Sequence, residues 1–553
     1  MKKKILLLAI VATTLTSCSF IDIANSKSNS GTTTSSSNLD GSSFSNSSTS
    51  SSSSNNSSSS FNNTNEIEKT NLTYTYKDYT TNSVYPIDSC PSVGTVKLLI
   101  IPIWFTDSTT YIKTAKKDTV REDIKKAYTG STSETGWHSV KTYYEEESQG
   151  KLTINATVSS WYETNKKSTY YYNDTSTGTY TTKTTDLVLE AVNWYFTNNP
   201  SDSRKNYDAD GNGYLDGVML IYGAPDTQAL NNESADNLWA YCYWLQDKNL
   251  KNTSNPGANT FFWASYDFMY GKTRAMTQTG TSYANGDTSH CTIDAHTFIH
   301  EMGHVFGLDD YYDYSNSKYV PAGGFSMQDY NVGGHDPYSV MALGWASPYI
   351  PTESTTITIG AFSETHDLIL LSTGFNSYKS PFDEYLLLEL YTPTGLNELD
   401  SKYQYGSYPT GPSTTGIRLW HVDARLTYVN SLTSVGEPIY LTSLTSNVEA
   451  GNYGVHHAMS NTYGSEEGYI SPLGSSYSNY NILQLIRNNK LSGYKPSDTL
   501  SSTSLFGNGS SFNISSYSKQ FVQGTKTNAG MAFNWSFKVS ISGSTATIQL
   551  TKN

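Results

Sequence analysis

The spacing of hydrophobic residues along the chain predicts strands in some segments and helices in others. Residues 97–105 form a continuous apolar run, which is typical of a buried strand, and residues 151–158 alternate apolar and polar positions, which predicts a half-exposed strand. Residues 117–128 and 138–148 have helical periodicity, and Gly150 is a natural stop for the second helix. The other elements predicted before residue 350 are a helix over 185–197 that starts at a Thr-Asp cap, strands over 217–223, 237–245 and 260–270, and a helix over 293–306.

Strands interleaved with helices predict an α/β domain over residues 90–350, built as a mixed twisted sheet with helices packed on it. Helical signals almost vanish beyond this point. Residues 384–391, 416–422 and 544–550 are strand-like. We therefore expect residues 351–553 to form a mostly β C-terminal region.

The first eighteen residues have the pattern of a secretory signal peptide. Three lysines at positions 2–4 precede an apolar stretch from Ile5 to Leu15, which is too short for a membrane-spanning helix. The segment ends in Leu-Thr-Ser-Cys18 and resembles a bacterial lipobox, in which the cysteine receives a lipid. The sequence thus predicts a lipoprotein anchored to the outside of the membrane, and the alternative is ordinary secretion with cleavage near Ser17.

A low-complexity segment separates this signal from the folded sequence. Serine occupies 20 of the 35 positions from 26 to 60. Such a composition cannot bury enough apolar surface to offset the entropy of ordering. We assign residues 19–89 to a disordered tether between the lipid and the predicted catalytic domain.

Composition narrows the classes of partner. With 36 basic and 49 acidic residues the formal charge is −13, so we expect no nucleic-acid partner. Charged residues make up only 15%, and polarity comes instead from Ser, Thr, Asn and 44 Tyr, which favours an extracellular surface. Four cysteines in 553 residues exclude a disulfide-built scaffold. We expect a monomer.

The strongest chemical signal is His300-Glu301-Met302-Gly303-His304 inside the last predicted helix of the α/β domain. Residues four apart lie on one helix face, so the two imidazoles can bind one ion. The intervening glutamate is placed to take a proton from water activated by the metal, as in zinc hydrolases. The competing interpretation is a core helix whose two histidines have structural partners.

The residues after the helix supply a third ligand. Gly307 predicts a helix end in the left-handed conformation, and Asp310 lies six residues beyond His304. This spacing matches the extended metzincin signature HExxHxxGxxH with Asp in place of the third histidine. Asp313 is the alternative ligand. No glutamate occurs between 302 and 352 that could serve from a separate downstream helix.

Further downstream, the segment Gly323-Gly-Phe-Ser-Met327 is predicted to form a Met-turn below the metal. The alternative is that Met327 is an ordinary core methionine. Tyr330 is a candidate donor to the tetrahedral oxyanion, and His335 is the alternative.

Several motifs occur in a common order along the chain. They are YYEEESQGKL at 143–152, YDADGNGYLD at 207–216, the zinc helix with GLDDYYD at 307–313, GGFSM at 323–327, LGW at 343–345 and WHVD at 420–423. Together they resemble the immune inhibitor A-like zinc metalloproteases of bacteria, over residues 90–350 and more loosely to about 510. The resemblance implies a secreted endopeptidase with a metzincin-like catalytic domain.

One feature departs from this family. Relatives with a long propeptide keep themselves latent, whereas only a short segment precedes the first predicted strand here. We expect Cys90 to be a buried or disulfide-bonded cysteine; the alternative is a thiolate that blocks the zinc.

A second metal candidate lies in the loop Asp208-Ala-Asp210-Gly-Asn212-Gly-Tyr214-Leu-Asp216. Oxygen ligands at positions 1, 3, 5 and 9, with the carbonyl of Tyr214 at position 7, suit a structural calcium ion. Position 12 is Met219 rather than the glutamate of an EF-hand. The alternative is a solvated turn.

These observations predict a zinc-dependent endopeptidase that acts on extracellular proteins, with Glu301 as general base. The alternative is a catalytically inactive protease-fold adhesin or glycan-binding lipoprotein, and a zinc hydrolase of non-peptide bonds has the same motif. A Trp/Tyr-rich run over 239–266 packs in the sheet or forms the cleft edge to which a substrate strand adds.

Overall fold

The fold is seen in a computed structural model of the 553-residue chain. It describes residues 67–81, 90–177, 182–245, 247–273, 293–313, 320–374, 379–405, 408–431, 434–435, 455–461, 480–493 and 498–553. The signal segment and Cys18 lie outside the described residues, as do Cys291 and most of the predicted tether.

A six-stranded mixed sheet forms the centre of the N-terminal half, with strand order β2-β1-β4-β6-β5 and β3 paired to β1. Its strands run parallel except for β5, which lies antiparallel at the edge beside β6. The strands are β1 Gly94–Trp104, β2 Leu152–Val158, β3 Tyr162–Glu163, β4 Val218–Tyr222, β5 Tyr241–Trp244 and β6 Thr260–Ser265. The predicted strand over 260–270 ends early, because a 3₁₀ helix takes Tyr266–Thr273.

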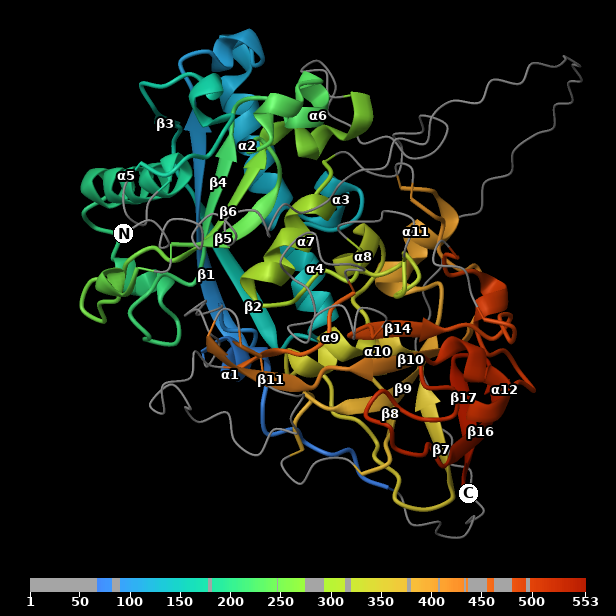
Figure 1. Cartoon of the computed structure of the whole chain (residues 1–553). Coiled ribbons are helices and arrows are strands. Elements are labelled where there is room, and N and C mark those ends of the chain that lie inside the picture. Colours follow the sequence, from blue (N-terminus) through green and yellow to red (C-terminus); the bar gives the residue numbers. More distant parts are fainter. Residues whose placement is uncertain are drawn as a thin grey trace, which may run out of the picture.

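Helices cover both faces of this sheet (Figure 1). Helix α5, Lys183–Asn198, packs on one face with a core of its own. The opposite face is covered by α2 (Lys117–Thr129), α4 (Val140–Glu147) and α7 (His296–Val305). The predicted mixed α/β architecture is confirmed. Helix α5 begins at the Thr182 cap, earlier than predicted, because Thr182 accepts a hydrogen bond from the backbone of Thr185.

The other α-helices are short. They are α1 Tyr76–Thr81, α3 Thr132–Thr135, α6 Thr227–Leu230, α8 Met327–Tyr330, α9 Pro337–Ala342, α10 Phe362–Thr365, α11 Glu398–Lys402 and α12 Ile514–Tyr517.

The C-terminal region contains further β sheets, as predicted. One sheet has the order β14-β10-β9-β8 and a second has the order β15-β16-β17-β7, and an apolar core lies between them. A small sheet joins β12, β11 and β13. The strands are β7 Thr355–Gly360, β8 Leu368–Leu371, β9 Glu384–Tyr391, β10 Gly416–Asp423, β11 Leu426–Ser431, β12 Ser434–Val435, β13 Val455–His457, β14 Leu483–Ile486, β15 Ser511–Asn513, β16 Trp535–Ser542 and β17 Thr545–Lys552.

The largest hydrophobic core crosses the predicted boundary at residue 350. It contains Phe298 and Trp345 from the N-terminal side together with Leu387, Trp420 and Leu485 from the C-terminal side. Tyr76 is fully buried in the same core, although it falls in the segment that the sequence assigned to the tether. The two halves therefore share one interior, and residues near Tyr76 belong to the folded part.

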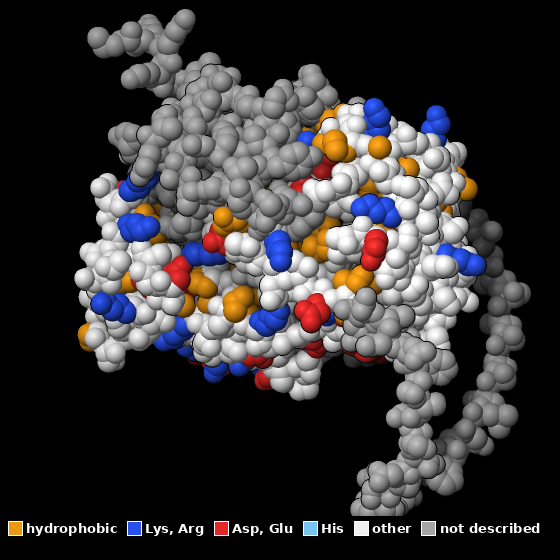
Figure 2. Space-filling view, turned by 90° about the horizontal axis from the view of Figure 1, so that it is seen from below, with side chains coloured by type: hydrophobic (Ala, Val, Ile, Leu, Met, Phe, Trp, Pro, Cys, Tyr) orange, Lys and Arg blue, Asp and Glu red, His pale blue; other side chains and the backbone are white. Residues whose placement is uncertain are grey.

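The surface is largely neutral. Figure 2 shows scattered charged side chains of both signs among neutral ones on this face, in keeping with a charged fraction of 15%. Among the described residues, every helix is too short or too polar to cross a lipid bilayer.

Candidate metal centre

Helix α7 ends in a way that turns the chain back toward its own histidines. The backbone N–H of Leu308 donates to the Gly303 carbonyl at 3.0 Å and that of Gly307 donates to the His304 carbonyl at 2.9 Å. Gly307 has a φ of +101°. This is a Schellman motif, in which glycine adopts the left-handed conformation without a Cβ penalty. The predicted helix end at Gly307 is thus present, and it directs the following residues over the helix face.

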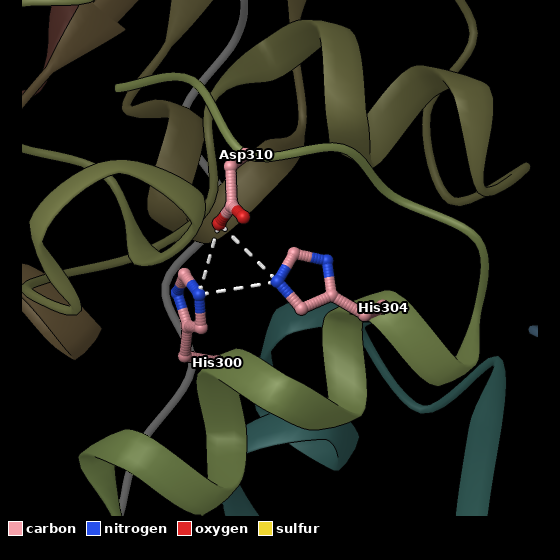
Figure 3. Close-up of side chains that lie close together, drawn as sticks. All are labelled: His300, His304 and Asp310. Carbon is pink, nitrogen blue, oxygen red and sulfur yellow. Dashed lines mark hydrogen bonds and ion pairs between the residues drawn. The ribbon is translucent and has the colours of Figure 1, made fainter. Parts of the chain in front are cut away.

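Three side-chain atoms converge at this place (Figure 3). The Oδ1 atom of Asp310 lies 3.0 Å from Nε2 of His300 and 3.2 Å from Nε2 of His304, and the two Nε2 atoms are 3.2 Å apart. The side chains of His300 and Asp310 are 0% and 5% exposed, whereas that of His304 is 12% exposed. The group is therefore buried and opens toward solvent on the His304 side.

The far side of each imidazole fixes its orientation. Nδ1 of His300 donates to the Met327 carbonyl at 2.6 Å, and Nδ1 of His304 donates to the Leu308 carbonyl at 2.7 Å. A neutral imidazole carries one N–H, so both Nε2 atoms then present lone pairs. Two lone pairs and a carboxylate oxygen that face one point repel one another unless a proton or a metal ion lies between them.

The spacing fits zinc. Zinc–nitrogen bonds of about 2.0–2.1 Å in a tetrahedron put neighbouring ligand atoms about 3.3 Å apart, close to the distances of 3.0–3.2 Å found here. Burial opposes ionisation of Asp310, but the positive charge of His304 and His300 in their protonated forms outweighs burial and lowers the pKa of the carboxyl. Asp313, the alternative ligand, is also buried but is not part of this group.

Glu301 is fully buried next to the three ligand atoms. Neither of its carboxylate oxygens has a hydrogen-bond partner of good geometry among the described residues. Burial raises the pKa of Glu301, and the neighbouring histidines oppose that shift. A buried carboxylate of this kind is suited to accept a proton from a bound molecule.

The Met327 segment lies directly under the histidines. Met327 is 0% exposed, and its carbonyl accepts the hydrogen bond from Nδ1 of His300. The next residue, Gln328, packs so close to α7 that a Cβ on Gly303 would lie 2.2 Å from its Oε1. Gln328 has no sequence signal of its own, but Gly303 inside a helix indicated a close approach.

The two candidate oxyanion donors have different surroundings. His335 is 1% exposed, and its Nδ1 lies 2.9 Å from the Tyr143 hydroxyl, on the side of α4. Tyr330 is half-buried, and its ring stacks on that of Tyr408 at 5.0 Å between centroids. The structure therefore engages His335 with α4, whereas Tyr330 remains partly accessible.

His296 has a structural role that the sequence did not reveal. Its ring lies between those of Trp137 and Tyr405, each 4.1 Å away between centroids. Nδ1 is 2.8 Å from Asp294, and Nε2 is 3.4 Å from Asp400. Burial opposes the charged form, but Asp400 and Asp294 outweigh it and raise the pKa of His296 to about 9. At neutral pH the imidazolium links the start of α7 to the C-terminal region.

The loop over residues 208–216 brings together the carboxylates of Asp208, Asp210 and Asp216, which have oxygens within 4.8 Å of one another. Burial and the neighbouring carboxylates raise the pKa of Asp216 to about 7. Lys77 from α1 lies 2.7 Å from Asp210. The amide oxygen of Asn212 accepts from the Tyr214 backbone at 2.8 Å, so it is turned toward the loop itself.

Cys90 is buried, as expected, and is not part of the group formed by His300, His304 and Asp310. Its side chain is fully buried, and its backbone N–H donates to the Val305 carbonyl at 2.9 Å. Burial raises the pKa of the thiol well above its usual value, which disfavours the thiolate that zinc requires. Cys90 and Cys242 are both free and buried.

Comparison with known proteins agrees with this geometry. Residues 106–330 match the family model described as immune inhibitor A peptidase M6, catalytic domain. The matched range includes both histidines, Glu301, Asp310 and the Met327 segment. A search of curated proteins found no match.

Replacing Gly303 by Ala tests the packing of α7 on the Met327 segment. Alanine is favoured over glycine inside a helix by about 1 kcal/mol, but its Cβ would displace the buried Gln328. We expect Gly303→Ala to lower the free energy of unfolding by about 1–3 kcal/mol, measured by urea titration. Gly507→Ala, where the added Cβ meets nothing within 4 Å, is the control. An unchanged or raised stability of Gly303→Ala would show that this close contact is absent.

Proposed function

Because residues 106–330 form a catalytic domain of the immune inhibitor A peptidase M6 family, the protein is a metallopeptidase, and we propose that it is a zinc-dependent endopeptidase with a metzincin-like active site. The observation that carries this proposal is the convergence of His300, His304 and Asp310 at distances suited to tetrahedral zinc. A peptidase takes protein or peptide substrates. The inactive-adhesin alternative is not favoured, because the three ligand atoms and Glu301 are all in place.

A zinc ion bound by these three residues would polarise the scissile carbonyl and make a water molecule more acidic. Glu301 accepts a proton from that water molecule while the water oxygen attacks the carbonyl carbon. Glu301 then delivers the proton to the leaving amine nitrogen when the C–N bond breaks. Tyr330, which is partly accessible at the end of α8, donates a hydrogen bond to the oxygen of the tetrahedral intermediate.

The edge strand β5 supports an extended substrate. Strand β5 is antiparallel at the border of the sheet and contacts α7. Its outer backbone groups can pair with a peptide that adds as a further strand, while side-chain pockets select the residues around the cleaved bond. A peptide bound in this extended form can present a bond within a longer chain to the metal centre, as the proposed endopeptidase activity requires.

Replacing Glu301 by Gln tests the general base. The substitution keeps size and hydrogen-bonding capacity but removes the basic carboxylate. We expect casein cleavage to fall by about 10²–10⁴-fold or more, while bound zinc, measured by metal analysis after dialysis, stays at the wild-type level. Glu190→Gln on the exposed side of α5 is the matched control. Cleavage at the wild-type rate by Glu301→Gln would reject the assigned base.

We also propose that the loop over residues 208–216 binds a structural calcium ion. Its three clustered carboxylates, with a buried oxygen of Asp208 that has no hydrogen-bond partner among the described residues, support this assignment. Asp208, Asp210 and Asp216 would be ligands, with Asn212 and the Tyr214 carbonyl completing the set after rotation of the Asn212 amide. The ion would stabilise a loop that precedes β4.

Calcium binding has a direct thermal test. At a calcium concentration 100 times the Kd, we expect the free energy of unfolding to rise by about 2.7 kcal/mol. Differential scanning calorimetry of the zinc-loaded protein, with and without calcium, measures the corresponding rise in Tm. Asp216→Asn should abolish that rise and Asp236→Asn, an exposed residue elsewhere, should keep it. An equal Tm with and without calcium would contradict the site.

For localisation, we propose a protein that is lipid-anchored at Cys18 and held outside a bacterial cell by the serine-rich segment. The support is the signal-like segment with its Leu-Thr-Ser-Cys ending and the neutral, charge-poor surface. Cys18→Ser should move the protein from the membrane fraction to the medium, measured by immunoblot of both fractions. Retention in the membrane fraction after this change would reject the lipid anchor.

A further inference from the structure

The segment that bears Asp310 is held on both sides by residues far along the chain. On one side, Nδ1 of His457 lies 2.8 Å from Oδ2 of Asp309. On the other side, the Asn461 side-chain amide donates to the Tyr311 carbonyl at 2.8 Å. His457 and Asn461 are 3% and 1% exposed, whereas the side chain of Asp309 is 34% exposed. Both residues belong to the C-terminal region, about 150 positions after Asp310.

Asn461 also joins this segment to the C-terminal sheet. Its amide nitrogen donates to the Leu483 carbonyl at 2.9 Å, and its amide oxygen accepts from the Leu483 backbone at 3.2 Å. Leu483 begins β14, which pairs with β10. One buried amide therefore uses its donors and its acceptor to connect a sheet of the C-terminal region with the backbone next to Asp310.

The remaining anchors of the segment come from the N-terminal half. The Tyr311 backbone donates to the Gln328 carbonyl at 2.8 Å, and its hydroxyl lies 2.9 Å from the Ser339 hydroxyl. The Tyr76 hydroxyl reaches Asp309 at 3.4 Å. Asp310 thus lies between Asp309 and Tyr311, each of which contacts one residue of the C-terminal region.

This arrangement matters because the three ligands are supported differently. His300 and His304 project from one helix, and carbonyl oxygens orient their rings. Asp310 belongs to neither a helix nor a strand, so its position depends on the tertiary contacts of the neighbouring residues. Loss of residues that orient a metal ligand typically weakens metal binding 10–100-fold.

We propose that the C-terminal region is part of the metal centre, and that Asn461 and His457 act as positioning residues for Asp310. This inference rests on the proposed zinc site. It assigns a role to the β region that follows the family-matched segment: the C-terminal sheet sets the geometry of the third ligand.

The test measures the zinc affinity of the full chain by competition with a chromophoric chelator, with Tm recorded for each variant. Asn461→Ala should weaken zinc binding about 10–100-fold and lower kcat more than it raises KM. Asn488→Ala is the matched control, because this amide donates to the Leu505 carbonyl at 3.2 Å in the same region but away from Asp310. It should lower Tm at an unchanged zinc affinity.

His457 provides a conservative rescue. His457→Ala removes the imidazole that lies beside Asp309 and should weaken zinc binding, whereas His457→Asn places an amide N–H near the position of Nδ1 and should restore most of the affinity. Wild-type zinc affinity in both Asn461→Ala and His457→Ala, with a lowered Tm, would overturn the proposal and leave a purely structural role.

The ligand assignment is checked separately. Asp310→Ala should lose zinc far more completely than either positioning variant, and Asp313→Ala should keep it. Zinc retained by Asp310→Ala would reject the proposed ligand set itself, whatever the result for Asn461. The two failures are therefore distinguishable.

Discussion

Two imidazoles whose Nδ1–H groups are bonded to backbone carbonyls determine how the rest of the site is arranged. Met327 and Leu308 accept those bonds, so the Nε2 lone pairs of His300 and His304 must face the same point. A carboxylate oxygen at 3.0–3.2 Å from them completes a set of three atoms that suits a tetrahedral zinc ion. The helix end at Gly307 and the course of the chain over the Met327 segment both serve to place these carbonyls.

The hydrophobic core shared by the N-terminal half and the C-terminal region is related to how the metal ligands are held. A carboxylate ligand on an irregular segment must be held by contacts from outside that segment, and here some of them come from beyond residue 450. The charged His296, stacked between Trp137 and Tyr405, joins the other end of α7 to the C-terminal region. Both ends of the catalytic helix are thus tied to elements that follow residue 350.

Local signals in the sequence predicted the local features well. The apolar run at 97–105 and the alternation at 151–158 correspond to β1 and β2, and the break at Gly307 lies where the helix ends. The spacing from His304 to Asp310 was enough to choose the carboxylate that lies nearest the histidines. These features depend on residues close together in the chain, where periodicity and turn chemistry carry the information.

Other features were beyond the reach of the sequence because they depend on distant partners. Nothing near His457 or Asn461 indicates that they meet Asp309 and Tyr311. The boundary predicted at residue 350 followed a change from helical to β periodicity, yet the core continues across it. Tyr76 lies close to low-complexity sequence and is nevertheless fully buried. Local composition indicates whether a segment is rich in polar residues, whereas the burial of a residue depends on which distant parts of the chain pack against it.

The shared core also sets an order of events while the chain is being made. A nascent chain that has reached residue 350 already contains α7 and both histidines, but it lacks Leu387, Trp420 and Leu485, which complete the interior around Phe298. Because domains generally fold as units, we expect the catalytic helix to reach its final packing only after the C-terminal part of this core has been synthesised. The factors that handle the emerging chain therefore meet an unfinished peptidase.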